Sequence, residues 1–138
     1  MRKGDQRPFL YDEILARSKD ILQLFDQQPV TVTTPIYSDP VECGAFRLFL
    51  LHLDVDSAGS PTTLQFEVQF LDRPGEKWHT WKQGLFAALF YEDEDTASGV
   101  QECFTGEVGG RSFRLKMTGV GTSAQAYFTV NAAVEFRN

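Results

Sequence analysis

The sequence has little of what several large classes of protein require. It has 13 basic residues against 19 acidic ones, which gives a formal net charge of −6. This balance argues against binding to nucleic-acid phosphates, which needs a clustered positive surface. No run of residues approaches the roughly 18 consecutive apolar positions of a membrane-spanning helix. The basic start leads into no apolar segment with a cleavage site, so no secretory signal is expected. We therefore expect neither a nucleic-acid partner nor a membrane.

Cysteine and histidine are few, and their spacing predicts no metal site. Cys43 and Cys103 form no CxxC pair, and His52 and His79 stand apart from both. A zinc site would have to assemble all four from remote segments without a recognisable ligand spacing. We expect two buried or half-buried free thiols, with a Cys43–Cys103 disulfide as the alternative if two strand ends meet. No cofactor is predicted.

Catalytic motifs are also missing. The serines lack a nucleophile-elbow context, and no glycine-rich loop joins a strand to a helix. Carboxylate pairs arise by chance in a chain with 19 acidic residues, so they are no evidence for catalysis unless their arrangement in space is known. We therefore predict that the protein is not an enzyme.

With 138 residues, 42% of them hydrophobic, the chain has the size and balance of one globular domain. Residues 1–29 read as an N-terminal arm. Within it the pattern predicts a helix over 9–27, because Pro8 suits a helix start and Pro29 would stop it. A partly extended arm is the alternative. The apolar residues close to one helical face are Leu10, Ile14, Ile21 and Phe25.

From Val30 onward the hydrophobic period changes from 3.6 to 2, which is typical of strands. A β-branched run at 30–34 predicts a short first strand. The clearest alternation is at 64–70, where apolar and polar side chains point to opposite faces. Turn residues separate about eight such segments. Residues 30–138 are therefore predicted to be all-β, an antiparallel β-sandwich of jelly-roll type.

Two acidic segments could be interpreted as metal-binding sites. Asp54–Gly59 has the alternate carboxylates and glycine of a calcium loop, but the closing glutamate is absent, so a strand end is preferred. Glu92–Asp95 places four charges in a row, which usually form a solvated loop. A weak divalent-ion site, or a contact with a basic partner, is the alternative there.

Trp78 and Trp81 are three residues apart, so on a strand they face opposite ways. One is expected in the core and the other partly exposed. An exposed tryptophan and histidine on a sandwich could stack on a sugar ring. Packing against the neighbouring strand is the preferred interpretation.

Two blocks of the body carry a family resemblance. Residues 46–69 are a strand ending in Asp-Val, a Ser/Gly/Pro/Thr loop and an alternating strand, followed by a turn at 74–78 that ends in tryptophan. Residues 110–123, with the alternating 127–136, form a second block that reads as a closing hairpin. Both blocks resemble small structural proteins of tailed bacteriophages. The arm and the acidic segment at Glu92 depart from that pattern.

The resemblance implies a virion protein, made in the host cytoplasm, that does no chemistry. Its expected role is head decoration (cement), in contact with the major capsid protein or other virion proteins and as a homo-oligomer. A neck or tail accessory protein and a carbohydrate-binding module are the alternatives. The arm is expected to dock on a partner, with packing onto its own sheet as the alternative. The docking residues proposed for it are Phe9, Leu10, Tyr11, Ile14 and Leu15.

Overall fold

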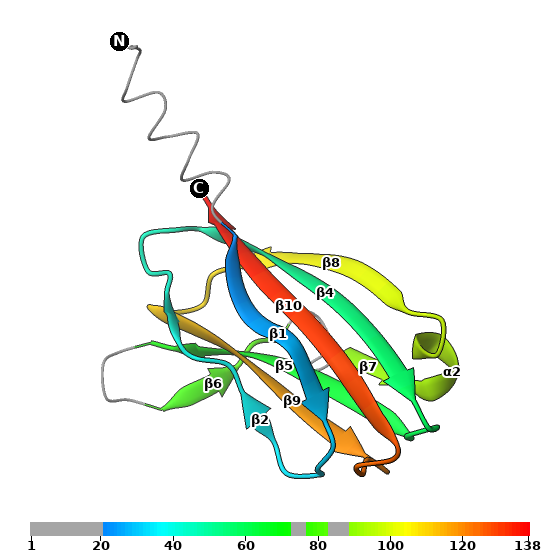
Figure 1. The fold of residues 1–138 in the computed structure, drawn as a ribbon. Helices are drawn as coiled ribbons and strands as arrows, with labels where there is room; N and C mark the ends of the chain where they lie inside the picture. The colour runs from blue at the N-terminus through cyan, green and yellow to red at the C-terminus, as the bar shows by residue number, and fades with distance from the viewer. Residues whose placement is uncertain (1–20, 73–76, 83–88) are drawn as a thin grey trace.

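The computed structural model describes residues 21–72, 77–82 and 89–138, which form two antiparallel β-sheets packed against each other (Figure 1). The first sheet has the order β1 (Leu22–Val30), β10 (Tyr127–Arg137), β4 (Leu48–Ala58) and β8 (Val100–Glu107). The second sheet contains β2 (Ile36–Tyr37), β3 (Val41–Glu42), β9 (Ser112–Val120), β5 (Thr63–Leu71), β6 (Trp78–Thr80) and β7 (Leu89–Glu92). A helical turn, α2 (Asp93–Thr96), lies between β7 and β8. Among the residues that the structure describes, no helix is long and apolar enough to span a bilayer.

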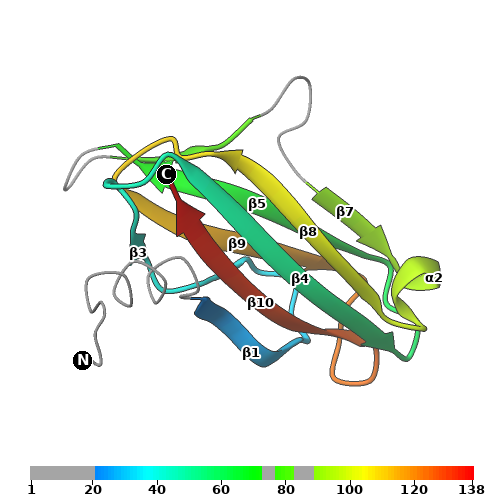
Figure 2. The ribbon, with the colours of Figure 1, turned by 90° about the horizontal axis from the view of Figure 1, so that it is seen from above.

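The topology is that of a jelly roll. In the second sheet, β2 and β3 pair with β9 on one side, and β6 and β7 pair with β5 on the other. If each of these short pairs counts as one interrupted strand, both sheets have four strands. The orders are then first–eighth–third–sixth and second–seventh–fourth–fifth along the chain. This is the double Greek-key arrangement of a jelly roll, and it confirms the predicted all-β sandwich (Figure 2).

The core lies between the sheets and is rich in aromatic side chains. Phe49 of β4 is 1% exposed, and its ring centroid lies 5.5 Å from that of Phe113 and 5.9 Å from that of Phe70. The Trp81 ring meets Phe49 edge-on at 5.3 Å, and Phe136 meets Phe113 edge-on at 5.6 Å. Such tilted and edge-to-face pairs add roughly 0.5–1.5 kcal/mol each beyond the area they bury. The cluster therefore holds both sheets together at one end of the sandwich.

The structure corrects the predicted helix at residues 9–27 in its C-terminal part. Residues 22–27 belong to β1, which pairs with β10, while residues 9–20 lie outside the described part of the chain. The predicted strand at 30–34 is also wrong, because Val30 ends β1 and residues 31–35 lie between strands. The first sheet therefore begins inside the segment, 1–29, that was assigned to the arm.

Irregular pairing explains why β1 reads as a helix. Its register against β10 shifts between Gln23 and Phe25 and again between Phe25 and Gln28, and Gln27 has a φ of 51°. Each bulge adds a residue to one strand only. The buried residues Phe25 and Val30 are consequently an odd number of positions apart, which breaks the strand period. Pro29 is accommodated because β1 is an edge strand, where a missing backbone donor costs little.

Candidate functional site

The predicted docking residues lie in the N-terminal segment that the structure does not describe; they are Phe9, Leu10, Tyr11, Ile14 and Leu15. The described chain begins with two exposed apolar side chains, Ile21 at 55% and Leu22 at 40% exposure. Leu22 pairs with Val134, so β1 starts beside the C-terminal end of β10 (Figure 1). Residues 1–20 therefore join the sandwich at this end, next to an exposed apolar pair.

The outer face of the second sheet holds an arginine between two aromatic rings. The Arg114 guanidinium carbon lies 4.2 Å from the centroid of the Tyr37 ring and 4.3 Å from that of Trp78. Arg114 Nε donates a hydrogen bond to Gln69 Oε1 at 2.7 Å. Tyr37 comes from β2 and Trp78 from β6, at opposite edges of the sheet, so both side chains reach over it towards β9. We call these three residues the arginine stack. Burial lowers the pKa of Arg114, but arginine stays protonated in proteins.

A charge-balanced network lies beside the stack. Lys116 Nζ is 3.8 Å from Glu67 Oε2, and the two side chains are 23% and 17% exposed. Glu67 also accepts hydrogen bonds from Gln65 Nε2 at 3.0 Å and from Thr80 Oγ1 at 3.1 Å. The Lys116 charge is thus compensated. No carboxylate of the described residues is in ion-pair distance of Arg114.

Exposed apolar side chains gather on the same face. Of the described residues, six large apolar side chains are exposed, and three of them share this surface: Tyr37 at 45%, Phe90 at 63% and Val120 at 51%. The register assigns them to it, because each lies opposite an outward-facing residue: Lys116 for Tyr37, Gln65 for Phe90 and Thr63 for Val120. The outer face of the second sheet therefore combines aromatic, aliphatic and guanidinium groups.

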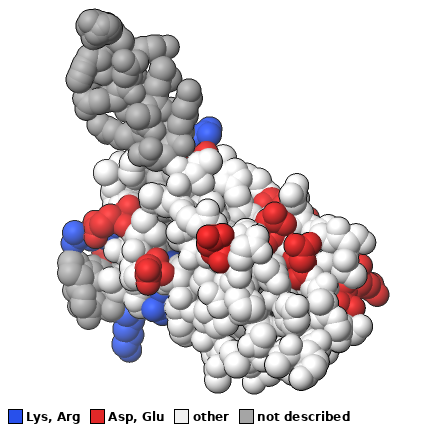
Figure 3. All heavy atoms as spheres, viewed as in Figure 1, with Lys and Arg blue, Asp and Glu red and all other residues white. Residues whose placement is uncertain are grey.

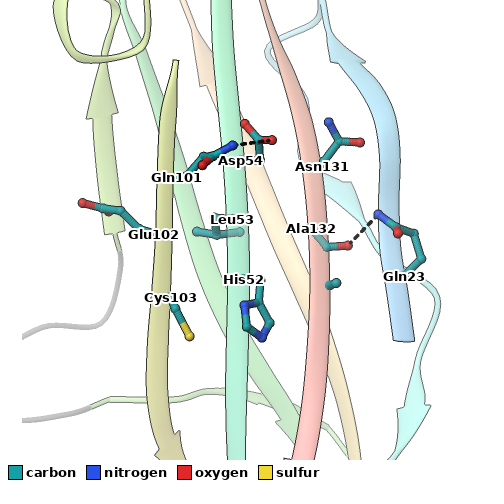
Figure 4. A pocket seen from close by; sticks show the side chains of 10 residues that line it. Gln23, His52, Leu53, Asp54, Gln101, Glu102, Cys103, Asn131 and Ala132 are labelled. Carbon is teal, nitrogen blue, oxygen red and sulfur yellow. Dashed lines mark hydrogen bonds between the residues drawn. The ribbon is translucent and has the colours of Figure 1, made fainter. Parts of the chain in front are cut away.

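The first sheet carries an open hollow on its outer face, lined by both polar and apolar groups (Figure 4). The strand register places His52 of β4 between Ala133 of β10 and Cys103 of β8. One step along the sheet, Gln101 Nε2 donates to Asp54 Oδ2 at 3.5 Å. Figure 3, in the view of Figure 1, shows acidic side chains spread over the visible side of the molecule. The side chains that line the hollow are Gln23, His52, Leu53, Asp54, Gln101, Glu102, Cys103, Asn131, Ala132 and Ala133.

His52 sits above a buried carboxylate. Its Nε2 is 3.9 Å from Glu135 Oε1, and Arg137 Nη2 binds that same oxygen at 2.9 Å. Among the described residues His52 Nε2 has no hydrogen-bond partner. No three histidine, cysteine or acidic side chains of the described residues gather in a way that could hold a metal ion. The neighbourhood of His52 and Cys103 was not predicted, because it depends on strand pairing between remote segments.

Both cysteines are free, so the alternative of a Cys43–Cys103 disulfide is wrong. Cys43 is 1% exposed, and its thiol lies 3.4 Å from the backbone oxygen of Gly110. Burial, with a smaller contribution from Glu42, raises the pKa of the Cys43 thiol to about 12. Cys103 is exposed on the outer face of the first sheet, not buried or half-buried as expected. The prediction of two free thiols is confirmed.

The acidic segment at 92–95 forms a helical turn, which corrects the predicted loop. Residues Asp93–Thr96 make α2, and the Glu92 backbone N–H donates to Asp95 Oδ2 at 3.4 Å. Ser57 Oγ donates to Asp93 Oδ1 at 2.7 Å, and the fully buried Thr96 hydroxyl donates to Ser57 Oγ at 2.8 Å. These bonds anchor the turn to the end of β4. The preferred interpretation of 54–59 as a strand end is confirmed, since β4 runs to Ala58.

The two tryptophans divide as predicted. Trp81 packs against the core, edge-on to Phe49, whereas Trp78 lies on the outer face over Arg114. The two indoles are both half-buried, but only that of Trp78 lies over the outer face of the second sheet. The partner residues of Trp78 could not be found from the sequence, because Tyr37 and Arg114 come from distant strands.

No protein-family model matches the chain, and no curated protein matches it significantly. The resemblance to phage structural proteins is therefore the ground for a proposal and not an identification.

Proposed function

We propose that this chain is a non-enzymatic structural protein of a tailed bacteriophage, a decoration or cement protein that binds and stabilises the assembled head. One observation carries the proposal. The two blocks that resemble phage structural proteins form β4, β5, β9 and β10, which are the central strands of both sheets. The resemblance thus covers the part of the chain that builds the sandwich, and not a peripheral loop.

The physical role of such a protein is to favour the assembled shell. A protein that binds only the assembled state stabilises it by mass action, and the effect grows with affinity and concentration. The formal charge of −6 keeps the sandwich away from packaged DNA and suits an outer surface. An arm that reaches a neighbour adds contact area and raises the effective concentration of the docked body. The partners we propose are the major capsid protein, other virion proteins and further copies of this chain.

Copy number on particles tests the proposal. Particles from a lysate of the source host are banded on a density gradient, and quantitative mass spectrometry gives the ratio of this chain to the major shell protein. A ratio near parity is expected for a protein that covers the head. A few copies per particle would instead indicate a neck or tail accessory protein. Absence from banded particles would refute the virion proposal.

The arm has its own test. Tyr11→Ala combined with Ile14→Ala should lower occupancy on particles at least ten-fold, because each buried side chain contributes roughly 1.5–3 kcal/mol. The unfolding midpoint of the variant should stay unchanged, since the described sheet pairing begins at Leu22. Val32→Ala, which trims a side chain that is 47% exposed outside the arm, is the matched control. Unchanged occupancy of the double variant would exclude docking through these residues.

A carbohydrate-binding module is the second candidate, and one observation favours it. Trp78 and Tyr37 lie on an outer sheet face that also offers Gln65, Gln69 and Glu67 as hydrogen-bonding groups. Titration of the Trp81→Phe variant with soluble glycans tests it, because fluorescence then reports Trp78 alone. Saturable quenching would favour this candidate, and its absence would favour the virion protein.

A further inference from the structure

Arg114 is oriented by three contacts with described residues of the second sheet. The centroids of the Tyr37 and Trp78 rings lie 4.2 and 4.3 Å from its guanidinium carbon, and Gln69 accepts the Nε hydrogen bond. That is its single side-chain hydrogen bond within the described residues. A guanidinium offers five N–H donors in a planar fork, and no acceptor among the described residues takes a hydrogen bond from its two terminal nitrogens. The side-chain entropy of orienting the fork is already lost before anything binds.

The charge on this face fits an acidic partner. Lys116 is neutralised by Glu67, whereas Arg114 has no carboxylate of the described residues near it. Within the described residues, Arg114 is therefore a cation without a carboxylate partner, in a chain whose formal charge is −6. Carboxylates bind an arginine fork through two parallel hydrogen bonds, which are among the stronger polar contacts in proteins.

The surroundings of Arg114 fit a protein surface. Tyrosine, tryptophan, phenylalanine and arginine are the residues enriched at the centres of protein interfaces. Tyr37, Trp78 and Phe90 lie on this face together with Arg114, and Phe90 is 63% exposed. Aromatic groups around a charged contact keep water from competing for it.

We infer that the outer face of the second sheet is a docking surface on which Arg114, fixed between Tyr37 and Trp78, binds an acidic side chain of a partner protein. The partner is the major capsid protein of the proposed function, on which the inference rests. In the complex the carboxylate lies in the plane of the guanidinium, with each oxygen accepting from one N–H donor. Tyr37 then packs against apolar groups of the partner beside this contact, and Phe90 does so farther along the same face.

Binding of full-length variants to purified particles lacking this chain tests the inference. Arg114→Gln removes the charge and the fork, and Arg114→Lys keeps the charge alone. Arg111→Gln removes one charge from an exposed side chain outside the stack and is the matched control. We expect Arg114→Gln to weaken binding at least ten-fold, Arg114→Lys to weaken it less, and Arg111→Gln to change it less than two-fold. The weakening should be largest at low salt, because exposed ionic contacts are screened as salt rises.

The outcomes distinguish failure of the inferred docking surface from failure of the proposed function. Failure of the wild-type chain to bind particles would overturn both. Wild-type binding with an equally tight Arg114→Gln variant would overturn only the docking surface, as would equal losses in Arg114→Gln and Arg111→Gln. Thermal unfolding of each variant shows whether the body is intact, and a body that unfolds with Arg114→Lys would assign the stack a structural role instead. Light scattering tests whether the face binds a second copy of this chain instead. If the wild-type chain forms an oligomer that Arg114→Gln dissociates, the proposed partner is overturned.

Discussion

Gly106→Ala tests whether Trp81 fills the space between the sheets. Gly106 lies on β8 opposite Phe49 of β4. A Cβ atom added there would lie 2.5 Å from Trp81 Cζ2 and 2.6 Å from Phe49 Cε2. Both distances are far below van der Waals contact, and the Phe49 ring is packed among other aromatic side chains. We expect the free energy of unfolding to fall by about 1–3 kcal/mol, the usual cost of overpacking a core.

A double-mutant cycle measures the part of this cost that the contact with Trp81 contributes, since the contact with Phe49 remains. Trp81→Leu removes the ring that the new methyl group meets, at its own cost of about 1–4 kcal/mol. The double variant Gly106→Ala/Trp81→Leu should then be at least about 1 kcal/mol more stable than the sum of the two single losses predicts. Such coupling arises because the methyl group enters the space that the indole leaves.

Urea unfolding followed by far-ultraviolet circular dichroism is the assay, since the fluorescence of Trp81 is lost in two of the variants. Gly44→Ala is the control, because its added Cβ would lie 3.4 Å from the nearest atom, the Arg111 Cα. Its effect should stay within about 0.5 kcal/mol. Strict additivity, or a Gly106→Ala variant as stable as Gly44→Ala, would refute the placement of Trp81. The indole would then be free for a surface ligand, which would strengthen the carbohydrate-binding candidate.

Two further predictions concern the thiols. At pH 8 a thiol reagent should modify the exposed Cys103 rapidly and the buried Cys43 at least about 1,000-fold more slowly. The difference arises because Cys43 reacts only after the fold opens. A Cys103→Ser variant that keeps the fast phase of modification would contradict this prediction. The second concerns alkaline unfolding. Burial raises the pKa of the Cys43 thiol from its ordinary 9.0 to about 12, so above pH 9 the unfolded chain ionises while the folded chain stays protonated. The contribution to stability is complete below pH 9.0 and is lost towards pH 12, at about 1.4 kcal/mol per pH unit. Cys43→Ala should flatten the fall in urea-measured stability over this range, and an unchanged slope would contradict the assigned cause.

The central strands could be predicted because their period is local. In β5, β9 and β10 every second residue enters the core, so the alternation is written in consecutive residues. Turn residues marked the boundaries between strands, and eight alternating segments are enough to indicate a sandwich. The described α2 turn was missed because its stability comes from Ser57, which belongs to a different strand.

The features on the two outer faces could not be predicted, because each depends on register between distant segments. The arginine stack joins residues of β2, β6 and β9, and the neighbourhood of His52 and Cys103 joins β4 to β8. The bulges in β1 are a further reason why the sequence does not predict this strand. They shift the inward positions of the strand, so Phe25 and Val30 do not fit a strand period. A single sequence shows which residues are present but not which of them are in contact in the folded structure.

The places of the arm and of the arginine stack make the two proposed contacts separable. Residues 1–20 join the sandwich at the start of β1, in the first sheet, whereas Arg114 lies on the outer face of the second sheet, across the core. If the arm and this face dock independently on a particle, the losses of Tyr11→Ala/Ile14→Ala and Arg114→Gln should multiply in the combined variant. If the arm instead packs over its own second sheet, its apolar residues and Arg114 act as one unit. The combined variant would then lose no more affinity for particles than the weaker-binding of its two parent variants. That result would place the arm on the sandwich.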